Sequence, residues 1–243
     1  MFKYIKFFFR GGYKILFSYP KIRKYAKHKD KYSFEDRYAF VRKLITCFFR
    51  AFRVEINSNG FDKLKSYETY LFVSNHQAVT DALTLVYLSE KPMTFVTKKE
   101  AMKYPFVGKV CYIIDSIFID RDNIRDAVKM VKTCKQYLND GLNVAIYPEG
   151  TRTKDENYMA AEYKAGAFKS AYETKKNIAV VAIDGSYKIF SKKYKKNFKI
   201  DIEVMDVYDF NNYESKNTVE LANEIQYKTN AWLDVIRQHK IKS

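Results

Sequence analysis

The sequence predicts an α/β fold, a mostly parallel sheet flanked by helices, preceded by a basic, amphipathic helical segment. Two observations lead to this prediction. The 243 residues are 47% hydrophobic and 30% charged, which suits one domain with a sizeable core. After residue 54, short apolar runs alternate with amphipathic ones, the pattern expected of strands and helices around a parallel sheet. We therefore divide the chain into a helical segment at 1–53 and a main domain at 54–243.

The first 53 residues carry most of the positive charge. They hold 15 basic and 3 acidic side chains, a net charge of +12 out of +16 for the chain, and 16 of its 40 Phe and Tyr residues. Within 1–17, cations recur every three or four residues and apolar side chains fall roughly opposite, which predicts an amphipathic helix. The cations are Lys3, Lys6, Arg10 and Lys14, and the apolar residues are Phe2, Ile5, Phe9 and Leu16. Gly11, Gly12 and Pro20 argue against one long helix, and a second helix is predicted at 34–52.

Such a segment suits an anionic bilayer surface, where rings enter the headgroup zone and cations meet lipid phosphates. No charge-free run reaches the ~18 residues needed to cross a membrane, and the charges interrupt the apolar core of a signal peptide. We therefore predict a peripheral protein at the cytoplasmic face of a membrane. One alternative is an ordinary helix packed on the domain. Nucleic acid is the competing partner, because stacking and phosphate neutralisation use the same residue types, but we do not expect it.

The main domain alternates strand and helix signals. Apolar runs predict strands at 69–74, 93–97, 113–119, 143–147, 178–183 and 198–205. Amphipathic stretches predict helices at 81–90, 123–139, 162–175 and 217–239. The helix at 123 follows Asp122, a suitable N-cap, and ends at Asn139-Asp140-Gly141.

Several classes of site are disfavoured. With only 8 Gly, the chain has no glycine-rich phosphate cradle, and it contains no GxGxxG, GxxxxGK[ST], HExxH or GxSxG motif. Cys47, Cys111 and Cys134 are odd in number and form no CxxC pair, so we expect reduced thiols, no disulfide framework and no metal site. A cofactor is not expected either.

The strongest chemical signal lies at the end of the strand at 69–74. His76 follows that strand, where open α/β sheets place their ligands, and Asp81 stands where the next helix begins. In one continuous helix the two side chains would diverge by about 140°, so they can meet only if the chain turns between them. A His paired with a carboxylate can take a proton from a hydroxyl near neutral pH. The alternative is a His that merely caps the strand.

Further strand ends present cations. The run Tyr147-Pro148-Glu149-Gly150-Thr151-Arg152 follows one strand directly, and its arginine offers a planar fork suited to phosphate. The run Phe118-Ile119-Asp120-Arg121 ends another, and Lys103 lies in the stretch 98–105 between it and His76. In isolation, the run at 147–152 would be taken for a solvated surface turn, and any single one of the other cations is unremarkable in a Lys-rich chain. Their shared position after apolar strands suggests one cationic rim.

In this order the motifs resemble the glycerolipid acyltransferase family, whose best-known members are 1-acylglycerol-3-phosphate acyltransferases. That family carries NHxxxxD, then a Phe-Ile-Asp-Arg-like run, a Phe-Pro-Glu-Gly-Thr-Arg-like run and an apolar strand usually containing Pro. Here the first three blocks are 75–81, 118–121 and 147–152, and the resemblance covers about 54–205. The chain departs from the family at Val180, where many members carry Pro, and at Tyr147, where Phe is commoner.

The resemblance implies a mechanism and a substrate. His76 would take the proton from the free hydroxyl of 1-acylglycerol 3-phosphate while Asp81 holds the ring, and the oxygen would attack the thioester of acyl-CoA or acyl-carrier protein to give phosphatidic acid. The residues implied in binding the lysophospholipid are Asn75, Lys103, Arg121, Glu149, Gly150, Thr151 and Arg152. Two alternatives stay open: another acceptor, such as glycerol 3-phosphate or another lysolipid, and a non-catalytic basic protein that binds nucleic acid.

Overall fold

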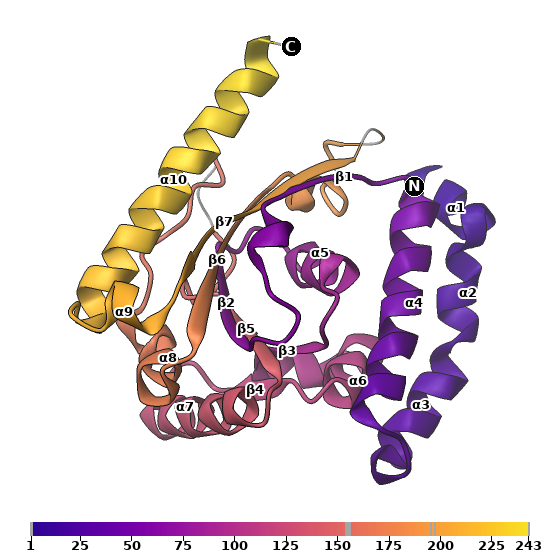
Figure 1. The fold of residues 1–243 in the computed structure, drawn as a ribbon. Coiled ribbons are helices and arrows are strands. Elements are labelled where there is room, and N and C mark those ends of the chain that lie inside the picture. The colour runs from indigo at the N-terminus through magenta and orange to yellow at the C-terminus, as the bar shows by residue number, and fades with distance from the viewer. Residues whose placement is uncertain (1, 154–156, 195, 197, 243) are drawn as a thin grey trace.

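A seven-stranded sheet forms the centre of the molecule (Figure 1). The structure, a computed structural model, describes residues 2–153, 157–194, 196 and 198–242. The strands lie in the order β1-β7-β6-β2-β5-β3-β4. In chain order they are β1 (Glu55–Asn59), β2 (Tyr70–Ser74), β3 (Met93–Lys98), β4 (Ile117–Ile119), β5 (Asn143–Ile146), β6 (Asn177–Asp184) and β7 (Lys199–Tyr208).

The strands that carry the motifs all run in one direction. Strands β6, β2, β5, β3 and β4 are parallel neighbours, whereas β7 is antiparallel to β6 and β1 pairs in parallel with β7. The carboxyl ends of the five parallel strands therefore meet at one edge of the sheet. The predicted α/β fold with a mostly parallel sheet is confirmed.

Helices cover both faces of the sheet and bury two apolar clusters. Tyr70 and Phe72 of β2 point to one face, while Leu71 and Val73 point to the other, as the two-residue period of a strand requires. The first face is covered by α4 (Phe34–Phe52), α5 (Thr80–Leu88) and α6 (Pro105–Ile113). The second is covered by α7 (Ile124–Asn139), α8 (Lys169–Thr174), α9 (Phe210–Tyr213) and α10 (Thr218–Lys242), whose far end extends beyond the sheet (Figure 1).

Residues 2–27 form a broken helix beside α4 (Figure 1). Its parts are α1 (Phe2–Phe7), a π-helical turn at Phe8–Gly12, α2 (Tyr13–Phe17) and α3 (Tyr19–Lys27). The break falls at Gly11, whose φ of 106° suits glycine. Lys3, placed in the cationic stripe by its spacing, instead donates hydrogen bonds from Nζ to the carbonyl oxygens of Ile189 (2.9 Å) and Tyr194 (3.1 Å). This lysine therefore ties α1 to the segment after β6.

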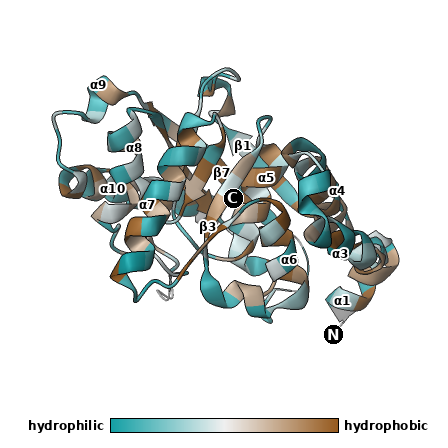
Figure 2. Ribbon diagram, turned by 90° about the horizontal axis from the view of Figure 1, so that it is seen from below, coloured by the Kyte–Doolittle hydropathy of each residue, from teal (hydrophilic) through white to brown (hydrophobic). Residues whose placement is uncertain are grey.

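Helix α4 shares the core of the main domain. It alternates hydrophilic and hydrophobic segments in Figure 2, and its buried Val41, Ile45 and Phe49 belong to the same apolar cluster as strands β2 and β6. Ser33 caps its first turn by accepting a hydrogen bond from the backbone N–H of Asp36. The domain boundary at residue 53 stays a prediction.

The structure differs from the predicted elements in several places. The predicted strand at 113–119 was wrong over its first half, because Ile113 ends α6, and Asp115, with a φ of 56°, reverses the chain before β4. Strand β1 was missed because its Glu-Ile-Asn-Ser-Asn sequence has no apolar run. The predicted helix at 162–175 is a short 3₁₀ turn followed by α8, and Asn123, rather than Asp122, caps α7.

Candidate functional site

The predicted site residues follow neighbouring parallel strands. Across the sheet in the order β2, β5, β3 and β4, the segments that follow these strands carry His76, Glu149, Lys103 and Arg121. Because neighbouring strands lie about 4.8 Å apart, the end of β4 is about 14 Å from the end of β2. The predicted cations Arg152, Lys103 and Arg121, which follow β5, β3 and β4, therefore lie on one side of His76.

His76 and Asp81 are in contact, as predicted. The chain turns after β2, and α5 begins at Thr80, so that Asp81 lies in its first turn. The ring Nδ1 of His76 lies 2.8 Å from Oδ2 of Asp81. The same oxygen accepts hydrogen bonds from the backbone N–H groups of Gln77 (2.7 Å) and Ala78 (2.9 Å). Three donors therefore converge on one oxygen of a completely buried carboxylate.

This contact selects the reactive nitrogen of His76. A carboxylate beside Nδ1 favours the tautomer that carries its proton there, which leaves Nε2 as the acceptor. The ring also stacks on Tyr147, with centroids 4.1 Å apart and planes 19° from parallel. Tyr147 is buried, and burial raises its pKa well above the usual range, so this phenol stays neutral. The stacking and the hydrogen bond together fix the orientation of the imidazole.

Glu149 faces the protein interior. One carboxylate oxygen accepts a hydrogen bond from the backbone N–H of His76 (2.6 Å), and the other accepts one from the N–H of Ala161 (3.0 Å). The side chain is only 5% exposed, and burial raises its pKa to about 7, against the lowering effect of these two donors. The contacts show Glu149 joining the His76 turn to the segment after β5, whereas the family resemblance assigned it to the acceptor.

The rest of the 147–152 run forms a turn. Gly150, with a φ of 70°, donates its N–H to the carbonyl of Tyr147 (3.0 Å), a conformation that favours glycine. A side-chain carbon added there would lie 3.2 Å from Nζ of Lys164. Thr151 and Arg152 are exposed, so the arginine can reach a ligand. Lys164, which is exposed, is a cation that the site prediction missed.

The other predicted binding residues differ in how accessible they are. The side-chain amide of Asn75 bonds at both ends to the backbone of Ile183 on β6, at 2.9 Å each, and so fixes one strand end to another. Lys103 is exposed at the end of the 3₁₀ turn after β3. Arg121 is half-buried, and desolvation lowers its pKa while Glu100 partly offsets this effect. The roles of these residues in binding an acceptor stay predictions.

A second network, absent from the sequence motifs, supports the His76 turn from α10. Gln77 donates from Nε2 to Asp184 (3.2 Å) and accepts the N–H of Gly185 (3.1 Å). Arg237 of α10 donates to the same Asp184 oxygen (2.9 Å) and to the carbonyl of Tyr158 (3.0 Å). A long separation in sequence, without a local pattern, hides such contacts from sequence analysis.

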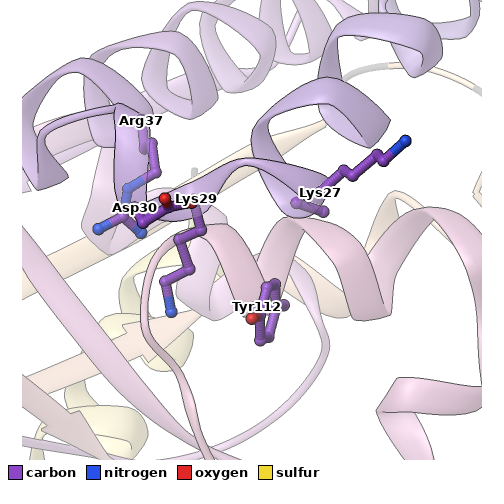
Figure 3. A pocket seen from close by; sticks show the side chains of 6 residues that line it. Lys27, Lys29, Asp30, Arg37 and Tyr112 are labelled. Carbon is purple, nitrogen blue, oxygen red and sulfur yellow. The ribbon is translucent and has the colours of Figure 1, made fainter.

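A separate cavity of about 430 Å³ lies beside α3 and α6 (Figure 3). Lys29 and Arg37, which help to line it, both pair with Asp115. Because Asp115 precedes β4, this cavity lies toward the opposite edge of the sheet from His76. Within the described residues, no group of three or more His, Cys, Asp or Glu side chains could hold a metal ion.

Comparison with known proteins identifies similar sequences over this region. The profile of the family described as "Acyltransferase" matches residues 55–184. A probable 1-acyl-sn-glycerol-3-phosphate acyltransferase of Mycoplasma genitalium is 32% identical over 182 residues, which are 68% of this chain and 66% of that protein. A 1-acyl-sn-glycerol-3-phosphate acyltransferase of Haemophilus influenzae is 28% identical over 63% of each chain. The matches thus span just under two thirds of these two relatives.

A solved structure extends the likeness to the whole fold. The 1-acyl-sn-glycerophosphate (LPA) acyltransferase PlsC of Thermotoga maritima superposes with a TM-score of 0.73, covering 97% of this chain and 95% of the other at 17% identity. At that identity the superposition shows a shared fold. Because the family profile covers more than half of the sequence, including the His76 turn, this chain belongs to the Acyltransferase family.

Proposed function

We propose that the protein transfers an acyl group from a thioester donor to the free hydroxyl of 1-acylglycerol 3-phosphate (lysophosphatidic acid), producing phosphatidic acid. The observation that carries the proposal is the contact of His76 Nδ1 with the buried Asp81 carboxylate, beside a row of cation-bearing strand ends. Relatives bearing the name of this activity support the choice of acceptor.

The contacts of His76 suit general base catalysis. Nε2 takes the proton of the acceptor hydroxyl while Asp81 stabilises the imidazolium that forms. The acceptor oxygen bonds to the thioester carbonyl carbon, the carbon–sulfur bond breaks, and the imidazolium returns its proton to the departing sulfur. The products are an ester and a free thiol. This sequence needs no covalent acyl-enzyme, and either acyl-CoA or acyl-carrier protein supplies the same thioester.

The acceptor phosphate would lie toward β5, β3 and β4. Arg152 and Lys164 lie at the turn after β5, next to the strand that leads to His76, and Arg121 extends the row at β4. Arg121 is partly desolvated and forms no ion pair with a described residue, so an anionic ligand would satisfy it. Arginine forks suit phosphate oxygens.

An acceptor panel tests this proposal. Purified protein is given acyl-CoA or acyl-carrier protein with lysophosphatidic acid, glycerol 3-phosphate or lysophosphatidylcholine, and thiol release and lipid products are measured. We expect lysophosphatidic acid to give the highest kcat/KM, with phosphatidic acid as product. A preference for glycerol 3-phosphate would contradict the proposed acceptor but not the proposed class of reaction. Thiol release that is equal without any acceptor would contradict both.

We further propose that α1 and α2 bind an anionic membrane surface. Phe9, Leu16 and Phe17 are 77%, 61% and 78% exposed, while the exposed Arg10 and Lys14 lie among them in the sequence, a combination that suits the headgroup zone. In the part of the chain that the structure describes, no helix is long and apolar enough to span a bilayer. The three cysteines are free, which fits the reducing conditions of the cytoplasmic face.

Replacing Phe9 and Phe17 together with alanine is expected to weaken binding to vesicles containing phosphatidylglycerol by at least about 10-fold. A fully buried Phe contributes about 1.5–3 kcal/mol, so even partial insertion of two rings is enough to change the affinity about 10-fold. Tyr67→Ala is the matched control, because this ring is 78% exposed but lies outside the N-terminal helices. Cosedimentation measures the affinity. Equal binding by the double variant, or an equal loss for Tyr67→Ala, would contradict the assignment.

A further inference from the structure

Ser186 lies beneath the first turn of α5, outside every motif found in the sequence. Strand β6 ends at Asp184, and Gly185 turns the chain with a φ of 92°. A side-chain carbon on Gly185 would come within 2.4 Å of the carbonyl oxygen of Lys199, so only glycine allows this turn without displacing backbone. The turn directs Ser186, which is completely buried, toward the start of α5.

Two residues of α5 hold Ser186 from both sides. Thr80 donates its hydroxyl to the carbonyl oxygen of Ser186 (2.8 Å). The hydroxyl of Ser186 in turn donates to Oδ1 of Asp81. His76, Gln77 and Ala78 all contact Oδ2. Within the described residues, Ser186 is thus the donor that serves the other carboxylate oxygen.

The division of donors between the two oxygens determines the orientation of the Asp81 carboxylate. Hydrogen bonds tolerate a range of angles, so contacts on Oδ2 alone leave the carboxylate plane some freedom to rotate about the Cβ–Cγ bond. A directed hydrogen bond to Oδ1 removes this freedom. It also satisfies a buried anionic oxygen, which would otherwise carry a desolvation penalty without compensation.

We propose that Ser186 is a positioning residue: it fixes the plane of the Asp81 carboxylate, and thereby the direction in which His76 presents Nε2 to the acceptor hydroxyl. The inference rests on the proposed role of His76 as the general base. Ser186 acts through Asp81 and touches no substrate. Its loss should therefore lower kcat and leave KM for the acceptor nearly unchanged, because misdirection of a base affects the chemical step.

The test compares Ser186→Ala with the control Thr84→Val. Thr84 is also completely buried on α5, and its hydroxyl donates to the carbonyl of Thr80 (2.8 Å) without contacting Asp81. We expect Ser186→Ala to lower kcat by about 10- to 100-fold, with KM changed less than about 2-fold, and Thr84→Val to keep the wild-type kcat. Thermal unfolding of both variants separates the loss of activity from a loss of folded protein.

A double-mutant cycle with Asp81→Asn distinguishes action through Asp81 from any other cause. If Ser186 acts by orienting Asp81, adding Ser186→Ala to Asp81→Asn should lower kcat less than about 2-fold, since the two effects share one path. An equal fold-loss in both backgrounds would overturn the proposal. So would wild-type kcat in folded Ser186→Ala. Absence of acyl transfer in the wild type would instead refute the proposed function, so the two failures are distinguishable.

Discussion

Replacing Asp81 with asparagine should lower kcat for acyl transfer by about 10²- to 10⁴-fold. Asparagine keeps the shape of the side chain but exchanges one acceptor oxygen for an amide donor. The amide oxygen can still accept from Nδ1 of His76 and from the two backbone N–H groups, and the hydroxyl of Ser186 can turn to accept from the new amide. What the substitution removes is the negative charge, which stabilises the imidazolium of His76 and favours the tautomer with its proton on Nδ1.

Initial rates at saturating acceptor and donor measure this effect, with circular dichroism to verify folding. Asp115→Asn is the matched control: it removes a carboxylate charge that pairs with Lys29 and Arg37, toward the opposite edge of the sheet. We expect this control to lower stability and to leave kcat close to wild type. If Asp81→Asn retained the wild-type kcat, the carboxylate would have no part in directing His76.

Replacing Glu149 with glutamine is expected to lower kcat by about 10²-fold, the factor associated with a misplacement of about 1 Å. Both oxygens of Glu149 accept backbone N–H groups, those of His76 and Ala161. The amide of glutamine can accept only one of them and must turn its own donor toward the other. The turn that carries His76 would therefore shift, although the Glu149 side chain contacts only the backbone N–H of His76 and not its ring.

The same substitution should change how stability depends on pH. The folded pKa of Glu149, about 7, lies above its ordinary value of 4.5 because burial disfavours the charged form. Its stabilising contribution is thus fully present below pH 4.5 and is lost as pH rises through about 7. Denaturant unfolding of both proteins from pH 4.5 to 8 should show the advantage of the wild type over Glu149→Gln shrinking with rising pH. An advantage that grows over this range would contradict the burial argument.

Periodicity predicted the inner part of the fold well. Strands β2, β5 and β6 are continuous apolar runs, as expected when both faces of a parallel strand are covered. The edge of the sheet was harder, because β1 is half exposed and is stabilised by pairing with β7, a partner more than 140 residues away. By composition, the apolar run before Asp115 fits a strand or a helix equally well. In the folded protein it forms the end of α6, which packs against α3 and α4.

In the site too, contacts between residues close in sequence could be predicted, whereas contacts between distant residues could not. The contact between His76 and Asp81 could be predicted, because a strand end and a helix start lie five residues apart. The inward position of Glu149 could not, since it depends on the backbone of Ala161 as well as on its own turn. Ser186 lies 105 residues from Asp81 and has no spacing that would reveal their contact. Such supporting contacts emerge only when the folded chain brings distant segments together.

The role of His76 as the base can be measured in one assay, which compares wild type and His76→Ala. The assay supplies lysophosphatidic acid and a labelled acyl thioester, and follows the rate of phosphatidic acid formation. We expect labelled phosphatidic acid from the wild type and a kcat at least about 10³-fold lower for the variant, because the variant lacks the imidazole that Asp81 contacts. Acyl transfer by folded His76→Ala at the wild-type rate would contradict that role.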